Sequence, residues 1–221
     1  MEKKLKAALA HVLWIGGGTD AGKTTVAEAI VERYQLQFYH FDRHEHSHIE
    51  RRIVAGDYVG RKNLFEMTPD ELWIDQLPEE MARGTIQGWS RRVDFVVDDL
   101  LAMPKQPLIV AEGPGFFPEV IQPLLSSPQQ AIWLVPEPQF KRKIAIQRGK
   151  PSVRHETRDP ALATENIIAR DLLMAQHVRT EATRLGLTLI EVDGAQSIEQ
   201  LIERVEQHFA PFLQARSTEK E

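Results

Sequence analysis

The chain has 221 residues, a net charge of −5 and no cysteine. This length suits one sizeable hydrophobic core and is short for two full domains. The absence of cysteine excludes disulfides, Cys-ligated zinc and a thiol nucleophile, and the acidic balance disfavours duplex nucleic acid as a partner. No apolar run reaches the roughly 18 residues of a membrane span, and no apolar signal region follows the charged start of the chain. We therefore expect a cytoplasmic protein with no membrane partner.

Five short apolar runs predict the strands of a sheet. Several of them are near-continuous in apolar residues, which is typical of parallel strands that are covered on both faces. The runs are 12–15, 36–41, 108–111, 131–135 and 187–192.

Helical periodicity fills the stretches between these runs. Apolar residues recur at helical spacing over 22–34, 93–101, 160–185 and 197–212. Asp159 has the position of an N-cap for the third of these helices. Strands that alternate with helices predict right-handed crossovers and an α/β fold with one parallel sheet.

One motif carries the chemistry. Residues 17–24 match G-x-x-x-x-G-K-[ST] in full, with an apolar strand before them and an amphipathic helix after them. Such a loop brings backbone N–H groups and a helix N-terminus to phosphate oxygens, while Lys23 reaches the β- and γ-phosphates and Thr24 offers a hydroxyl to Mg²⁺. The alternative is a glycine-rich turn with a chance lysine. The predicted ATP-binding residues here are Gly17, Gly18, Thr19, Asp20, Ala21, Gly22, Lys23, Thr24 and Thr25.

With this motif, the chain resembles the nucleoside-monophosphate-kinase-like group of P-loop kinases, which includes shikimate, gluconate and nucleoside kinases. The resemblance covers most of the chain in its order of elements, but only the phosphate-binding loop is a sharp match. It implies a three-layer αβα domain spanning 1–221, with a five-stranded parallel sheet of strand order 2-3-1-4-5. It also implies a helical acceptor-binding insert at 43–107 and a mobile basic lid at 139–160.

Two carboxylates at strand ends are candidate catalytic residues by this resemblance. Asp42 follows the second predicted strand, where related kinases carry a carboxylate that faces the acceptor hydroxyl; the alternative is a helix cap. Glu112 follows the third predicted strand, where an acid holds Mg²⁺ through water or orients the nucleophile; the alternative is a solvent-facing turn acid. An Asp is more usual than a Glu at the second of these positions, so that match is partial.

The segment 141–158 holds seven basic residues against one acid and lies in the expected lid. Lid arginines would clamp phosphates and neutralise charge on the transferring group, and we choose Arg154 and Arg158 for this catalytic role. Arg148 is expected on the adenine or α-phosphate side. The alternative is a solvated basic helix end.

Two weaker signals remain. Asp193-Gly194 follows the fifth predicted strand, where related kinases line the adenine with backbone groups, although this dipeptide is also a plain turn. Four histidines crowd into 40–48. The pair His44 and His48 has the i, i+4 spacing of metal ligands on a helix, but imidazoles on a pocket rim are the simpler interpretation.

The function favoured by these residues is an ATP- and Mg²⁺-dependent kinase for a small metabolite. A nucleoside or nucleotide, a sugar acid and an antibiotic-like hydroxyl compound are all compatible acceptors. One alternative is a regulatory ATPase or GTPase switch that acts on a protein partner, although the chain has no N-K-x-D for guanine. Another is a nucleic-acid-end kinase, which the acidic balance disfavours.

Overall fold

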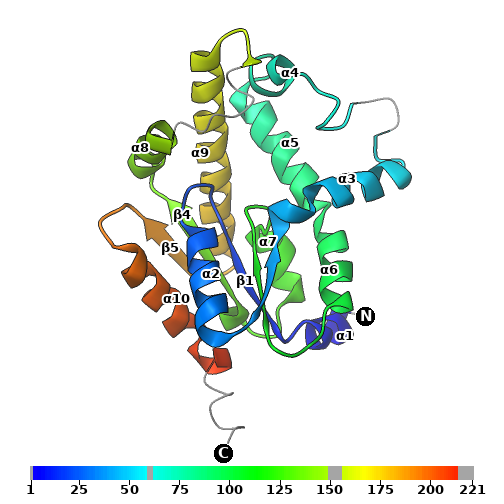
Figure 1. The fold of residues 1–221 in the computed structure, drawn as a ribbon, viewed down its shortest axis with the longest axis vertical. Helices are drawn as coiled ribbons and strands as arrows, with labels where there is room; N and C mark the ends of the chain where they lie inside the picture. The colour runs from blue at the N-terminus through cyan, green and yellow to red at the C-terminus, as the bar shows by residue number, and fades with distance from the viewer. Residues whose placement is uncertain (1, 59–61, 149–155, 214–221) are drawn as a thin grey trace, which may run out of the picture.

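The computed structural model describes residues 2–58, 62–148 and 156–213. Its centre is a five-stranded parallel sheet in the order β2-β3-β1-β4-β5, which confirms the expected strand order (Figure 1). The strands are β1 (Val12–Gly17), β2 (Gln37–His40), β3 (Ile109–Glu112), β4 (Ala131–Pro136) and β5 (Leu189–Val192). The expected second strand is shorter than 36–41, because Phe41 already belongs to the 3-10 turn η1 (Phe41–His44).

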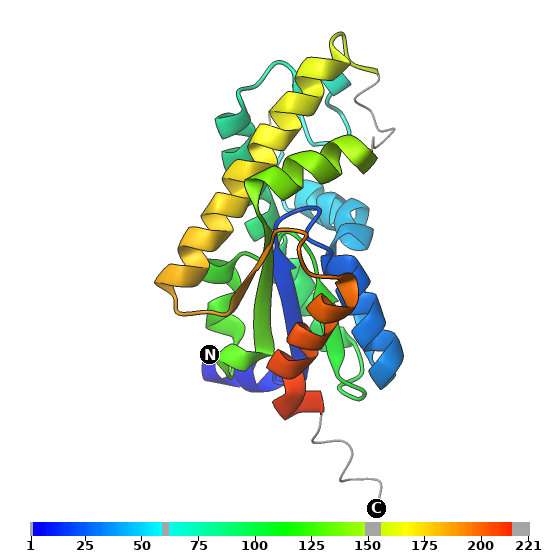
Figure 2. The ribbon, with the colours of Figure 1, turned by 90° about the vertical axis from the view of Figure 1, so that its left-hand side faces the viewer.

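Helices cover both faces of the sheet, and Figure 2 shows α9 (Pro160–Arg184) on one side with α2 (Lys23–Tyr34) and α10 (Ile198–Leu213) on the other. Along β1, Val12 and Trp14 join the core under α9, whereas Leu13 and Ile15 join the core under α2 and α10. Successive side chains of a strand point to opposite faces, so a strand between two helical layers must be apolar at every position. This is why the run 12–15 is uniformly hydrophobic.

The helices begin and end where local signals place them. The side chain of Asp159 accepts a hydrogen bond from the backbone N–H of Leu162 at 3.0 Å, as expected of an N-cap, and Gly186 follows the helix with a φ of +64°. Ser197 and Gln200 form the two hydrogen bonds of a capping box at the last helix. The helices along the outer layers are α1 (Glu2–Ala8), α2 (Lys23–Tyr34), α7 (Pro118–Ile121), α8 (Pro138–Arg148), α9 (Pro160–Arg184) and α10 (Ile198–Leu213), with 3-10 turns η2 (Gln122–Leu124) and η3 (Pro128–Gln130).

The stretch 43–107 is helical where the structure describes it. It holds α3 (Glu45–Val54), α4 (Pro69–Trp73), α5 (Pro78–Ser90) and α6 (Val93–Ala102). Both α4 and α5 pack against α9, beyond the end of the sheet at which the parallel strands finish (Figure 1). This is the end of the sheet at which ligands of open α/β folds bind; the acceptor-binding role of the stretch stays a prediction. Within the described ranges, each helix is too short or too polar to cross a lipid bilayer.

Candidate active site

The phosphate-binding loop, residues 17–24, connects β1 to α2 in a conformation that its glycines permit. Gly17 has a φ of +121°, and a Cβ on it would lie 2.0 Å from the carbonyl oxygen of Leu134 on β4. Gly22 has a φ of +79° and directly precedes α2, and no side chain caps that helix. The uncapped N–H groups at the start of α2 are the donors that an anion at a helix N-terminus takes.

Lys23 lies inside this loop. Its side chain is buried, and its Nζ donates a hydrogen bond to the carbonyl oxygen of Gly18 at 2.7 Å. Burial lowers the pKa of Lys23, while the charges of Glu112, Asp42 and Asp20 act in the opposite direction. The ammonium group is therefore held within the loop by the Gly18 carbonyl, and three carboxylates favour its charged form.

Glu112, the last residue of β3, contacts the phosphate-binding loop. Thr24 Oγ1 donates a hydrogen bond to Glu112 Oε2 at 3.2 Å, and His40 Nε2 lies 3.5 Å from the same oxygen. Parallel pairing places Glu112 beside both Ile15 and His40, so the ends of β1, β2 and β3 meet here. Burial raises the pKa of Glu112, and the charges of Lys23 and His40 oppose that shift. The adjacent Thr24 hydroxyl and Glu112 carboxylate are oxygen ligands of the kind that Mg²⁺ prefers.

Asp42 lies at the surface, next to the end of β2. It follows β2 in η1, it is exposed, and its charge acts on the pKa values of both Lys23 and Glu112. The residue at the N-cap of α3 is His44, which forms no side-chain cap hydrogen bond. The helix-cap interpretation of Asp42 is therefore not supported, and its carboxylate is free to face a ligand.

The other loop residues have different surroundings. Ala21 is buried in the hydrophobic core, and Thr25 is exposed in the first turn of α2. Thr19 and Asp20 contact Lys141 of α8. The sequence offered Lys141 only as one of seven basic residues, and it gave no signal for Asp171 of α9, which joins the same contacts.

The predicted lid arginines do not converge on the loop in the described part of the chain. Arg158 forms ion pairs with Asp75 at 2.6 Å and Asp70 at 3.4 Å, and its side chain is 56% exposed. Arg154 and the side chain of Arg148 lie outside the described residues. Gly194 has a φ of +81°, and a Cβ on it would lie 2.6 Å from the ring of Phe140 on α8. The 193–195 turn therefore packs on the base of the lid segment, and its contact with adenine stays a prediction.

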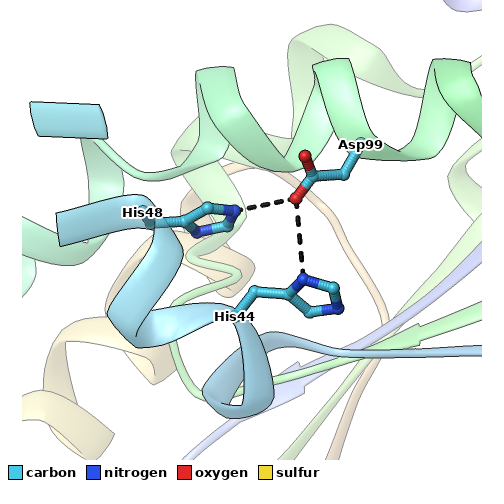
Figure 3. Close-up of side chains that lie close together, drawn as sticks. All are labelled: His44, His48 and Asp99. Carbon is cyan, nitrogen blue, oxygen red and sulfur yellow. Dashed lines mark hydrogen bonds and ion pairs between the residues drawn. The ribbon is translucent and has the colours of Figure 1, made fainter. Parts of the chain in front are cut away.

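The histidine cluster forms a hydrogen-bond network, and Figure 3 shows His44 and His48 turned toward Asp99 of α6. His48 Nε2 lies 2.8 Å and His44 Nδ1 3.8 Å from Asp99 Oδ2. Arg92 Nε, which can only donate, points at His48 Nδ1 at 3.3 Å, so the neutral ring carries its proton on Nε2 and donates to Asp99. If a metal ion were bound at His48 Nε2, the proton of the neutral ring would lie on Nδ1. The Nδ1 atom could then no longer accept the hydrogen bond from Arg92. We infer a structural network that joins β2, α3 and α6.

Three arginines of the stretch 43–107 have carboxylate partners. Arg51 contacts Asp98 and Asp99, Arg52 contacts Asp57, and Arg92 contacts Glu45. Arg92 is also 1% exposed and donates to the carbonyl oxygen of Phe41 at 2.7 Å. These side chains hold the insert together instead of facing a free binding surface.

Comparison with known proteins gives fold-level similarity only. No protein-family model matches the chain, and no curated protein matches it. A crystal structure of shikimate kinase from Bacteroides thetaiotaomicron is 17% identical with a TM-score of 0.44, covering 92% of this chain and 98% of that one. An unliganded sugar kinase from Janibacter sp. HTCC2649 is 17% identical with a TM-score of 0.46, covering 91% and 96%. The chemistry of the site is argued from its own residues.

Proposed function

We propose that the protein is an ATP-dependent kinase, which transfers the γ-phosphoryl group of ATP to a hydroxyl or phosphate of a small metabolite. The observation that carries this proposal is the convergence of Lys23, Thr24 and Glu112 at a full phosphate-binding loop, with Asp42 in electrostatic range. Phosphoryl transfer needs positioning and charge neutralisation more than covalent chemistry, and these are what this set of groups supplies.

Each group has a role in the proposed reaction. The loop N–H groups and the start of α2 bind the phosphates, and Lys23 neutralises charge on the β- and γ-phosphates. Thr24 and Glu112 would hold Mg²⁺, which neutralises phosphate charge when it is bound. Asp42 orients the acceptor hydroxyl and takes its proton as the acceptor oxygen bonds to the γ-phosphorus and the bond to ADP breaks.

The lid would complete the site. Arg158 precedes α9 and is held by Asp70 of α4 and by Asp75, which follows α4. Exposed ion pairs of this kind contribute only about 0–1 kcal/mol, so the negative charge of a bound nucleotide is enough to compete for the guanidinium. We propose that Arg158 exchanges these partners for phosphate on closure, together with Arg154, while Arg148 contacts the adenine or α-phosphate side and Gly194 lines the adenine.

The acceptor side favours recognition through hydroxyl groups. Arg51, Arg52 and Arg92 are engaged by carboxylates of the insert, whereas the carboxylate of Asp42 is exposed. Uncharged or amine-bearing polyols therefore suit the described surface better than phosphorylated acceptors do.

The test is ADP release from ATP and Mg²⁺ with a panel of acceptors. The panel holds nucleosides, nucleotides, sugar acids, polyols and aminoglycoside- or phenicol-type antibiotics, with a control that lacks acceptor. We expect one hydroxylated class to raise ADP release. Equal release with and without every acceptor would contradict the kinase proposal and favour a nucleotide switch, and salt-dependent phosphorylation of an oligonucleotide 5′ end would identify a nucleic-acid kinase.

Variants assign the roles. Lys23→Ala should abolish turnover, with the exposed Lys3→Ala as its control. Asp42→Asn should lower transfer by about 100-fold or more while ATP affinity is kept, because it removes the proton acceptor and leaves the phosphate contacts. The exposed Asp94→Asn is the matched control. Unchanged transfer in Asp42→Asn would remove Asp42 from the mechanism.

A further inference from the structure

Lys141 lies at the junction of three segments that are far apart in sequence. It is on α8, its side chain is only 2% exposed, and it lies between the phosphate-binding loop and α9. Its Nζ donates to Thr19 Oγ1 at 2.7 Å, to Asp20 Oδ2 at 2.5 Å and to Asp171 Oδ2 at 2.6 Å. An ammonium group has three N–H donors, so every one of them has a partner here.

Among the described residues, two carboxylates and two cations meet in this junction. Asp171 and Asp20 are the anions, Lys141 is one cation, and Arg170 is the other, through Nε and Nη2 contacts to Asp171 Oδ1 at 3.0 and 2.6 Å. Burial alone would raise the pKa of Asp171, but Arg170 and Lys141 hold it at about 2. Thr19 adds a further hydrogen bond to Asp171 Oδ2 at 2.7 Å. The donors of Lys141 and both carboxylate oxygens of Asp171 thus have partners within the described part of the chain.

The two loop residues in this network set the shape of the phosphate-binding loop. Asp20 has a φ of +64°, a left-handed conformation that is uncommon for residues with a side chain, although Asp adopts it more readily than most. Its carboxylate and the hydroxyl of Thr19 are both held by Lys141. The backbone N–H groups of this loop must be aimed before a phosphate arrives if they are to bind it without reorganisation cost.

We propose that Lys141 is a positioning residue, which ties the phosphate-binding loop to the base of the lid segment through the Asp171 junction. It acts through Thr19 and Asp20 and does not touch the nucleotide. This inference rests on the proposed function, since it assumes that the loop binds ATP. It concerns nucleotide binding, which can be measured without turnover.

The test measures the dissociation constants of ATP–Mg²⁺ and ADP by calorimetry on the full-length protein, together with Tm. We expect Lys141→Met to weaken both nucleotides at least tenfold and to lower Tm, and Lys141→Arg to lie between it and the wild type. Arg179→Met is the matched control, because it breaks another ion pair of α9, with Glu191 of β5, away from the loop. It should leave nucleotide affinity unchanged.

A double variant separates positioning from simple stabilisation. Lys141→Met combined with Asp20→Asn leaves Arg170 and Asp171 as a balanced pair, so Tm should recover toward the value of Asp20→Asn alone. Affinity should stay low, because Thr19 and residue 20 still lack their anchor. Affinity that recovers together with Tm, or wild-type affinity in folded Lys141→Met, would overturn the inference. A wild type that binds ATP but transfers to no acceptor would reject the kinase proposal alone.

Discussion

Arg92→Met tests the physical account of how the insert is held over the site. Arg92 lies between α5 and α6 and is 1% exposed. It donates to the carbonyl oxygen of Phe41 at 2.7 Å, to Glu45 Oε1 at 3.1 Å and to His48 Nδ1 at 3.3 Å. Its guanidinium carbon also lies 3.7 Å from the centre of the Phe41 ring. Methionine keeps most of the aliphatic stem and removes every donor.

The expected loss follows from the acceptors that are left behind. A buried acceptor without a partner costs about 1–3 kcal/mol, and the Phe41 carbonyl and His48 Nδ1 both lose their donor. The charge-assisted contact with the half-buried Glu45 adds about 1 kcal/mol. Together these give about 3–7 kcal/mol, which includes the range of about 3–5 kcal/mol measured when one partner of a buried ion pair is removed. Since domains are stable by about 5–15 kcal/mol in total, the variant should be folded but much weakened.

Urea denaturation, followed by circular dichroism, measures this loss. Arg91→Met is the matched control, because the neighbouring arginine is exposed, and it should change the free energy of unfolding by less than about 0.5 kcal/mol. A loss below 1 kcal/mol in Arg92→Met, or equal losses in the two variants, would refute the argument that the buried guanidinium holds the insert. Because the Phe41 carbonyl precedes Asp42, we also expect phosphoryl transfer to fall in Arg92→Met at denaturant-free conditions.

Three further variants test other parts of the fold. The hydrogen bond to Glu119 raises the pKa of His177, so this pair stabilises the protein fully below pH 6.5 and loses its contribution as the pH rises through the folded pKa. His177→Gln should therefore lower stability at pH 6 and make thermal stability less dependent on pH between 6 and 8. An unchanged pH profile would contradict this argument. Gly113→Ala should cost about 1–3 kcal/mol, because its Cβ would lie 2.1 Å from the Cβ of Phe41. Gly84→Ala, with no neighbour within 4 Å of the added atom, should instead stabilise helix α5 by about 0.5–1 kcal/mol, and a destabilisation as large as that of Gly113→Ala would show that steric crowding is not the cause.

Local sequence patterns were enough to predict the helices, the strands and the phosphate-binding loop. Continuous apolar runs, an Asp-Pro helix start at 159 and a glycine-rich loop are short-range features, so a single sequence carries them. The structure confirms the sheet order. It also brings Thr24 and Glu112 into contact, while their role as Mg²⁺ ligands stays a prediction. The predicted and observed strand ends differ by up to two residues. Phe41, for example, was expected in the second strand but belongs to the turn η1. Contacts from the rest of the chain decide between strand and turn at such positions.

What the tertiary structure decided is which charges meet. Lys141 and Arg92 look like ordinary basic residues in the sequence, yet each is buried against carboxylates 30 or more residues away. His48 looks like a metal ligand until the donor from Arg92 sets its tautomer. Hydrophobic periodicity depends on the neighbours along the chain, whereas a buried charge is stabilised only by the particular partners that folding brings to it. For that reason the sequence by itself determined the α/β framework and the phosphate-binding loop, and only the packing of α8 and α9 decided how that loop is held.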